Sequence, residues 1–423
     1  MGFNYKEYRD PLYGFVSVSE LEQEIIDTKY FQRLRNIKQL GTTFLIYPSA
    51  MHSRFEHSLG TLFVVDKWYD ELVLNKNNLN ELKWSSEEVE QYRILVRLAA
   101  LLHDIGHSPF SHAAQELFPQ KEGKTKYEHE DYTYKIITET EIKDTISKHM
   151  KEEEAAEKIA EMAIGLSKEK DLAFLSELLT GDFGADRIDY LTRDSYYLGV
   201  QYGKFDIHRL LNTMFVRYND EKKGPELAVD DGGVHTIEGF LLARYFMFLD
   251  VYFHKTRRIM DKHLVEFLIE FLEGRCYPLD IRDYVLWDDT KVYQLLVEKR
   301  YLKSAKRLLD REHFRLSFET VDHPELHELG MFNWLLDKVK DRFDSNLIKD
   351  DDADKSPYSF NKPPFFVKHN NVYKSLKERS SLIRSLEKIF KRRIYADASI
   401  RKDVGDFCKN FWEREIRKIR EAK

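Results

Sequence analysis

Apolar residues recur at helical spacing along the chain as far as residue 272. Between Ser19 and Gln39, residues such as Leu21 and Ile25 mark one apolar face with the three-and-four spacing of a buried helix side. Ser19 is a favourable N-cap, and Gly41 is a favourable stop. The same spacing predicts further helices over residues 55–72, 91–104, 130–137, 152–166, 171–180, 185–194 and 237–272.

Two stretches depart from the helical pattern. Residues 215–218 and 226–229 flank a charged turn that contains glycine, which predicts a small β-hairpin. Residues 344–364 carry three prolines and, between positions 350 and 354, four aspartates, which predicts an exposed loop or a connection between subdomains. We therefore expect a mostly α protein, with a helical core over residues 1–275 and a smaller mixed α/β C-terminal subdomain over residues 276–423.

Charge and composition narrow the class of protein. The chain has 423 residues, 33% of them charged, and a formal net charge of −6. That balance is unlike the overall basic charge of a dedicated nucleic-acid binder, although a local nucleic-acid contact stays open. Two cysteines cannot form a disulfide framework, and no apolar run is long enough for a membrane helix. These features predict a cytoplasmic protein without a membrane partner.

Histidines are concentrated in one part of the sequence. Six of the fifteen lie between residues 52 and 129. Within this region, the stretch LLHDIGHSPFSH over residues 101–112 places adjacent His103 and Asp104 at the end of an apolar helix. Because a buried imidazole without a partner is costly, such a cluster more often surrounds a metal or phosphates. Mixed histidine and carboxylate ligands suit divalent Mn, Fe, Co, Ni or Zn, and Mg is a further candidate.

Four segments together carry a resemblance to a known family. They are QRLRNIKQLG over residues 32–41, RFEHSLG over 54–60, HDIGHSPFSH over 103–112 and DRIDYLTRD over 186–194. In this order they resemble the HD superfamily of metal-dependent phosphohydrolases. More narrowly, they resemble the SAM-and-HD-domain deoxynucleoside triphosphate triphosphohydrolases and their bacterial relatives. The resemblance implies a helical HD-domain fold, a catalytic core over residues 1–275, and a regulatory or oligomerisation role for residues 276–423.

The resemblance implies two groups of catalytic side chains. The metal ligands would be His57, His103, Asp104 and Asp186. Around the phosphates would lie His107, His112 and His129, of which the last two are candidates for proton transfer. The alternatives are a structural polar network for the ligands and helix-capping or surface positions for the three histidines.

One residue departs from the family pattern. In the animal enzymes an aspartate follows the counterpart of His112 by three positions, whereas here that position is Gln115. A neutral amide cannot stabilise an imidazolium as a carboxylate does, so the general-acid role of His112 is in question. Glu116 or Glu130 could take the aspartate's place, and the sequence does not choose between them.

The resemblance also assigns residues to the substrate. The phosphates would be contacted by Arg54, Arg187, Arg244 and Lys255. The sugar would be bound by Gln39 and Asp194 and packed by Tyr190 and Tyr252. Arginine suits phosphate because its planar group donates to two oxygens at once. The alternative for these residues is ordinary surface ion pairs and core aromatics.

Four further positions match the site at which the tetrameric animal enzymes bind an activating guanine nucleotide. They are Asp27, Gln32, Arg35 and Arg311. The acidic Asp230 and Asp231 stand where regulated enzymes carry basic residues, which weakens the match. The basic run over residues 391–393 could contact phosphate, nucleic acid or another subunit, although such a run is more often a solvated edge. The resemblance implies a homo-oligomer, either a dimer or a tetramer.

Three functions follow as hypotheses. The first is hydrolysis of a deoxynucleoside triphosphate to deoxynucleoside and triphosphate, by attack of metal-activated water at the α-phosphorus. The second is an HD phosphohydrolase that acts on another nucleotide or on a nucleic-acid phosphate ester. The third is a non-catalytic, nucleotide-binding assembly protein.

Overall fold

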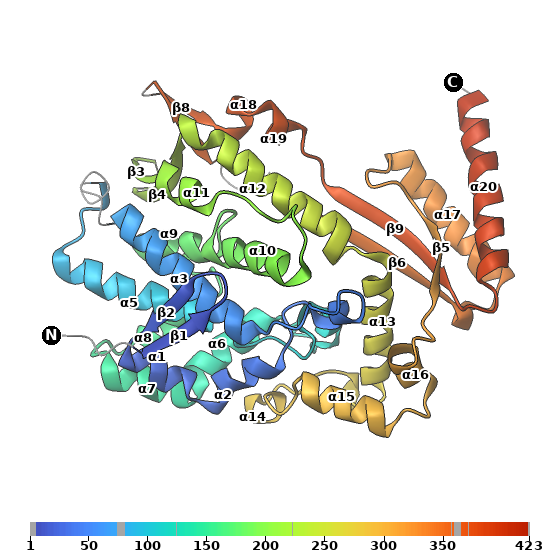
Figure 1. Ribbon diagram of the computed structural model, residues 1–423, viewed down its shortest axis with the longest axis horizontal. Coiled ribbons are helices and arrows are strands. Elements are labelled where there is room, and N and C mark those ends of the chain that lie inside the picture. Colours follow the sequence, from blue (N-terminus) through green and yellow to red (C-terminus); the bar gives the residue numbers. More distant parts are fainter. Residues whose placement is uncertain are drawn as a thin grey trace. The chain divides into compact units, whose positions relative to one another are not determined.

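A computed structural model describes residues 6–73, 81–123, 125–221, 223–356, 358, 365–370 and 372–421. The chain forms two compact units (Figure 1). The first contains residues 1–244, 276–292 and 358–385, and the second contains residues 245–275, 293–357 and 386–423. The functional division predicted at residue 275 stays a prediction. No helix in the described ranges is long and apolar enough to cross a membrane.

The first unit is mainly helical. Its helices are α1 (Glu20–Ile26), α2 (Lys29–Gln32), α3 (Arg54–Val73), α5 (Ser86–Leu102), α6 (His129–Glu139), α7 (Glu141–His149), α8 (Ala155–Ala163), α9 (Lys170–Thr180), α10 (Ala185–Leu198), α11 (Ile207–Thr213), α12 (Val234–Phe246, shared with the second unit), α14 (Ile281–Tyr284), α18 (Leu376–Arg379) and α19 (Ser381–Ser385). Short 3₁₀ turns are η1 (Arg33–Asn36), η2 (Gly41–Leu45), η3 (Ser111–Leu117) and η4 (Asp231–Gly233).

Two small sheets complete the first unit. The hairpin of β1 (Lys6–Asp10) and β2 (Gly14–Val18) is antiparallel. The second sheet has the order β3 (Met214–Asn219), β4 (Gly224–Asp230), β7 (Phe366–His369) and β8 (Val372–Ser375), with β4 and β7 parallel. Its β3–β4 pair confirms the predicted hairpin.

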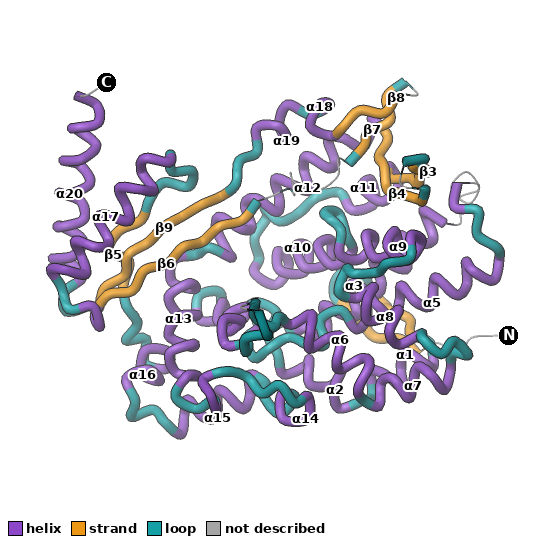
Figure 2. The backbone as a smooth tube through the Cα atoms, turned by 180° about the vertical axis from the view of Figure 1, so that it is seen from behind, coloured by secondary structure: helices purple, strands orange, loops and turns teal. Residues whose placement is uncertain are grey.

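Helix α3 is the centre of the first unit. It packs against α5 and α10 (Figure 2), and its Trp68 and Tyr69 are fully buried. The apolar stripe of α5, including Leu98 and Leu101, is also fully buried. Burial on this scale stabilises the fold by roughly 25 cal/mol for each Å² of apolar surface. Since α3, α5 and α10 carry the HD-type motifs, the core fixes these motifs relative to one another.

The second unit combines a three-stranded sheet with helices (Figure 1). The sheet has the antiparallel order β5 (Arg315–Glu319), β9 (Ile389–Ala396), β6 (Ile348–Lys355). Helices α17 (Leu326–Arg342) and α20 (Arg401–Glu421) bury Phe332, Leu335 and Cys408 against it. The remaining elements are the π-helix η5 (Met247–Tyr252), α13 (Lys255–Ile269), η6 (Glu273–Arg275), α15 (Asp289–Glu298, begun in the first unit), α16 (Lys303–Leu309) and η7 (Ser345–Leu347).

The loop predicted over residues 344–364 was wrong for its first half, which contains strand β6. Asp351 and Asp352 lie opposite Arg393 and Arg392 of β9, and Arg258 donates to both carboxylate oxygens of Asp351. Arg393 is 1% exposed, so the basic run is not a solvated edge either. Paired cations therefore let this acidic segment form a strand. The prolines of the predicted loop lie outside the described residues.

Two predicted helices are interrupted by local capping. The helix expected over residues 19–39 is broken at Thr28, whose hydroxyl accepts from Phe31 N and starts α2. The helix expected over 237–272 ends in the π-turn, and His254 accepts from Thr256 N to start α13. A side chain that satisfies a free backbone N–H favours a new helix start over continuation of the old helix. The hairpin β1–β2 and helix α7 were not predicted.

Candidate metal and phosphate site

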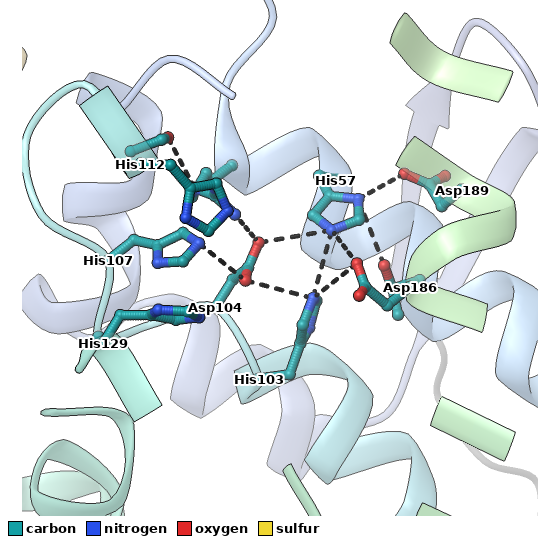
Figure 3. A network of polar contacts seen from close by, with 12 residues as sticks. His57, His103, Asp104, His107, His112, His129, Asp186 and Asp189 are labelled. Atoms are coloured by element: carbon teal, nitrogen blue, oxygen red, sulfur yellow. Dashed lines mark hydrogen bonds and ion pairs between the residues drawn. The ribbon is translucent and has the colours of Figure 1, made fainter. Parts of the chain in front are cut away.

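Three elements of the first unit deliver the four predicted metal ligands. His57 lies one turn into α3, His103 and Asp104 follow the C-terminal end of α5, and Asp186 lies in the first turn of α10. Because α3 packs on both other helices, the four side chains come together (Figure 3). The helical core thus brings together side chains that lie far apart in the sequence, such as His57 and Asp186.

The donor atoms of these four residues converge on one point. His57 Nε2 lies 3.1 Å from Asp186 Oδ1, 3.4 Å from Asp104 Oδ2 and 3.2 Å from His103 Nε2. His103 Nε2 lies 3.5 Å from Asp104 Oδ1 and 3.6 Å from Asp186 Oδ1. Such spacings match the edges of a coordination shell around one small cation.

Hydrogen bonds on the outer side of each imidazole fix its tautomer. His57 Nδ1 lies 2.7 Å from a carboxylate oxygen of Asp189, and His103 Nδ1 lies 2.8 Å from the carbonyl oxygen of Ala100. Both partners are acceptors, so both Nδ1 atoms carry hydrogen and both neutral rings direct their Nε2 lone pairs inward. Two lone pairs facing each other at 3.2 Å repel, and positive charge at this point, a proton on His57 in the metal-free protein or a bound metal ion, removes that repulsion. The residues therefore fit a divalent metal.

The electrostatics of the cluster also favour a cation. Burial opposes protonation of His57, but hydrogen bonds with Asp186 and Asp189 raise its pKa to about 10. Burial acts against the ionised Asp104, but Arg54 and the two histidines hold the pKa of this carboxyl below its ordinary value. The pKa of Asp186 is likewise lowered, against burial, by His103 and His57. The carboxylates thus stay ionised and attract positive charge.

Asp189 and Arg193 support the cluster from behind. Arg193 donates to both oxygens of Asp189 at 2.9 Å, and its guanidinium also lies 2.9 Å from Asp10 Oδ2. All three side chains are at most 5% exposed. Gly60 makes room for them, since a Cβ at that position would overlap Asp189 and Arg193. This buried network holds the His57 ring in place.

The cluster is open on one side. The side chain of Asp186 is 30% exposed, whereas those of His57, His103 and Asp104 are at most 6% exposed. A ligand therefore reaches the cluster past Asp186.

His107, His112 and His129 form a second group beside the first (Figure 3). One ring nitrogen from each lies within 4.8 Å of the others, and the rings of His107 and His129 are 3.8 Å apart. Gly106 permits this approach, because a Cβ there would overlap the backbone of His129 and Thr133. His107 Nε2 lies 3.4 Å from Asp104 Oδ1, which links the groups.

The second group differs from the first in charge. Burial, followed by the charge of Arg54, holds the pKa of His107 well below its ordinary value. Burial and the neighbouring His112 do the same for the pKa of His129. These two rings are therefore neutral near pH 7 and can accept or relay protons when charge develops beside them. A phosphate oxygen or a cation would fit among the three rings.

The predicted phosphate-binding arginines have acidic or polar partners. Arg54 forms a short ion pair with Asp104 and donates to Ser111 Oγ at 2.8 Å. Arg187 pairs with Asp182. Arg244 is 3% exposed and hydrogen-bonds with Tyr190. The structure thus places Arg244, Arg187 and Tyr190 near one another, and their contact with phosphate stays a prediction.

Gln39 and Asp194 come together through a residue that had been given no role. His52 Nε2 lies 2.8 Å from Asp194 Oδ1, and Gln39 N donates to the backbone oxygen of His52 at 3.0 Å. Among the described residues, the buried Gln39 Oε1 has no hydrogen-bond partner. The His52 ring stacks on Tyr197 with 4.6 Å between ring centres. This polar group could bind a hydroxyl of a ligand.

The proposed activator residues divide between the units. In the first unit, Arg35 donates to Gln32 Oε1 at 2.8 Å, and Asp27 accepts from Gln23 at 2.8 Å. Arg311 lies in the second unit with a left-handed backbone, at φ 58°. Tyr252 and Lys255 also belong to the second unit. Their part in a shared site stays a prediction.

Sequence reasoning missed Asp189, Arg193 and His52. The spacing of Asp186, Asp189 and Arg193 on one helix signals a shared face, since residues three and four positions apart are neighbours. The sequence does not show that this face meets His57. His52 belongs to the histidine-rich region, but its partner Asp194 lies 142 positions away.

Comparisons with known proteins agree with this geometry. The HD domain matches residues 54–194, and the HD-associated region matches residues 205–327. A hypothetical protein of Aquifex aeolicus has a similar solved structure, with 35% identity and a TM-score of 0.81 over 95% of this chain and 99% of that one. A phosphohydrolase of Bacteroides thetaiotaomicron shares the fold, with 22% identity and a TM-score of 0.71 over 93% of this chain and 100% of that one.

The chain belongs to the HD-domain phosphohydrolase family. It is 28% identical over 75% of its length to a deoxynucleoside triphosphate triphosphohydrolase SAMHD1 homolog of Dictyostelium discoideum, of which it covers 60%. It is 36% identical over 62% of its length to the uncharacterized protein YwfO of Bacillus subtilis, of which it covers 55%. The chain thus spans between half and two thirds of the length of these curated relatives.

Proposed function

We propose that this protein hydrolyses deoxynucleoside triphosphates to deoxynucleoside and inorganic triphosphate. The observation that carries the proposal is the convergence of His57, His103, Asp104 and Asp186 on one point, with the Nε2 atoms of both histidines directed inward. These four residues would hold a divalent cation, whose identity among Mn, Fe, Mg, Ni, Co and Zn stays open. When bound, the cation would lower the pKa of a water molecule and offset charge on the phosphate.

Side chains around this cluster match the parts of a nucleotide. Arg187 and Arg244 would take phosphate oxygens, because guanidinium groups donate to two oxygens at once. Gln39 Oε1, which has no hydrogen-bond partner in the described part of the chain, would accept from the sugar 3′-hydroxyl, beside the Asp194–His52 pair. Tyr190, hydrogen-bonded with Arg244, would pack on the deoxyribose and exclude a 2′-hydroxyl by steric overlap.

The test is a product analysis. Purified protein is incubated with each deoxynucleoside triphosphate and Mg²⁺ or Mn²⁺, with and without GTP or dGTP, and the products are separated by chromatography. Deoxynucleoside and triphosphate are the expected products. Monophosphate with pyrophosphate, or no turnover under any of these conditions, would contradict the proposal.

A pocket in the second unit supports activation by an anionic ligand. Its volume is about 220 Å³, and it is lined by Lys255, His313, Arg315 and Arg401 among others. Arg315 Nη2 donates to the backbone oxygen of Arg311, which connects this pocket to a residue of the proposed activator site. We propose that residues 276–423 take part in nucleotide regulation or assembly. A rate increase on adding GTP, lost in Arg315→Ala, is the expected result.

The two other functions make different predictions. An HD phosphohydrolase for another phosphate ester would hydrolyse its substrate equally well after Gln39→Ala, because that ester has no deoxyribose at this position. A non-catalytic assembly protein would contain negligible metal in both the wild type and Asp186→Ala. The four ligand side chains and their outer hydrogen bonds favour the catalytic functions.

A further inference from the structure

One contact of His112 in the second histidine group is with an amide. Gln115 Oε1 lies 3.0 Å from His112 Nδ1. An amide oxygen accepts the Nδ1 hydrogen without adding negative charge, so it supports a neutral ring better than a protonated one. A proton for a leaving group therefore needs a better-placed acidic source.

Glu130 brings a carboxyl group to His129 of the same histidine group. Glu130 Oε2 lies 3.1 Å from His129 Nδ1. Both atoms are shielded from solvent, and neither forms an aligned hydrogen bond with any other described residue. Glu116, the other glutamate close in sequence to His112, is exposed. The two buried atoms are thus placed to exchange a proton after a small adjustment.

Capping of helix α6 does not explain the orientation of the Glu130 carboxyl group. At the start of α6, Glu128 is the N-cap, and its backbone N–H donates to Asp131 at 2.8 Å. Asp131 also pairs with Lys121 at 2.7 Å. The neighbouring acids therefore have structural roles, whereas the Glu130 carboxyl turns to the histidine group.

The environment of Glu130 favours its acid form. Burial raises its pKa to about 7, and the charges of Glu128, Asp104 and Asp131 act in the same direction. Among the described residues, these acids have the largest charge effects on Glu130, and His129 is its printed ion-pair partner. A group with a pKa near the working pH transfers protons in both directions with least cost. The Glu130 side chain is also 41% exposed, so solvent can restore its proton.

We propose that Glu130 supplies protons to His129 and thereby positions this histidine as the acid that protonates the leaving oxygen. This inference rests on the proposed function. Water adds its oxygen to the α-phosphorus, and the bond from phosphorus to the 5′-oxygen breaks with its electron pair on that oxygen. The 5′-oxygen takes a proton from one ring nitrogen of His129 while the other, Nδ1, receives one from Glu130, so the ring stays neutral, and solvent returns a proton to Glu130. The proton lost by the attacking water goes to solvent, so one water is consumed.

The leaving group provides a sharp test. A deoxynucleoside 5′-alkoxide is strongly basic and needs a proton as it leaves, whereas 4-nitrophenolate does not. General acid catalysis contributes roughly 10²- to 10⁴-fold to a rate. We therefore expect Glu130→Gln to lower kcat for a deoxynucleoside triphosphate about 100-fold, while hydrolysis of thymidine 5′-(4-nitrophenyl phosphate) to nitrophenol changes little. Glu116→Gln, which removes the same charge from an exposed neighbouring position, should retain both activities.

The pH dependence separates proton supply from a structural role. In the wild type, kcat for the triphosphate should fall as the pH rises above about 7, because the acid form of Glu130 is lost. Glu130→Asp should keep this fall in kcat, at a shifted pH, because aspartate still carries a titrating carboxyl group. Glu130→Gln should not show the fall. The inference would be overturned if Glu130→Gln lowered the activity toward both substrates equally. It would also be overturned if the rate and its pH profile were unchanged in this variant.

A measurement without substrate keeps the inference separate from the proposed function. Spectra of ¹⁵N-histidine-labelled protein, with His129 assigned from a His129→Gln variant, report how its ring titrates. We expect Glu130→Gln to move this titration and Glu116→Gln to leave it in place. Identical His129 titration in all three proteins would refute the coupling even if triphosphate is released. If the coupling is present but the wild type releases no triphosphate, then the proposed substrate is wrong instead.

Discussion

Gly60→Ala tests whether the buried support behind His57 is needed for metal binding. Gly60 lies inside α3, where alanine would ordinarily stabilise a helix by about 1 kcal/mol. Here the added Cβ would overlap Asp189 Oδ1 and Arg193 Nη2, and it would lie 2.7 Å from Asp189 Cγ. That carbon alone would have to retreat by 0.7 Å to reach ordinary contact at 3.4 Å. Such a shift would lengthen or misalign the 2.7 Å hydrogen bond to His57 Nδ1 and so weaken it.

The expected loss of stability and of metal affinity follows from the interactions that this shift disturbs. Separating a buried ion pair costs about 3–5 kcal/mol, and Arg193 would keep Asp10 at 2.9 Å, which favours the lower end. After the gain in helix propensity, we expect a net loss of about 2 kcal/mol in the free energy of unfolding. Loss of the outer hydrogen bond of a ligating histidine typically weakens metal binding about 10- to 100-fold.

The matched control is Gly239→Ala. Gly239 also lies within a helix, α12, but a Cβ there would meet nothing within 4 Å. Urea unfolding of the metal-free proteins measures stability, and calorimetric titration with Mn²⁺ measures affinity. If Gly60→Ala matches Gly239→Ala in both measurements, then Asp189 does not constrain His57 and our account of the support is wrong.

Three further predictions concern the site. Asp186→Ala should bind less metal than the wild type in elemental analysis, because the side chain is one of four converging ligands; equal content in both would remove Asp186 from the set. Gln39→Ala should raise KM for deoxynucleoside triphosphates about tenfold, as expected for one lost hydrogen bond of roughly 1.4 kcal/mol, and should spare 4-nitrophenyl phosphate; equal effects on both substrates would argue against a sugar contact. In metal-free protein, the pKa of His57 is raised from 6.5 to about 10, so its protonation stabilises the fold fully below pH 6.5, and that stabilisation is lost as the pH rises through 10. Urea unfolding between these pH values should show this decline without Mn²⁺ and a weaker one with it, and the same decline in both would contradict the assignment.

The sequence predicts most helices of the first unit because their determinants are local. Ser19 caps α1 as predicted, and the apolar spacing of residues 55–72 places α3 within one residue of its observed bounds. Strand β6 was missed because its stability depends on cations in β9, about forty positions later in the chain. Local composition showed the aspartates, whereas only the register shows that Arg392 and Arg393 lie opposite them.

The candidate site, like the fold, has residues that local sequence predicts and contacts that it does not. The motifs identify His57, His103, Asp104 and Asp186, and the structure brings these residues together. The support by Asp189 and the contact of His52 with Asp194 depend on how α3 meets α10 and how the loop before α3 reaches it. No local pattern in the sequence predicts how these helices and this loop pack against one another. The choice between Glu116 and Glu130 is also three-dimensional, since it depends on which carboxyl group faces a histidine.

Asp104 connects the two groups of histidines, and its negative charge favours protonation in both. It lies within 3.5 Å of His57, His103 and His107, and its charge raises the pKa of His129, against the larger effect of burial. A cation held by Asp104 would offset that charge and leave His129 with even less affinity for a proton. The phosphates of an incoming nucleotide would act in the opposite direction, because negative charge beside an imidazole raises its pKa. His129 would thus become an effective acid only when substrate is present, and a proton store such as Glu130, outside the metal cluster, would then be needed to supply it.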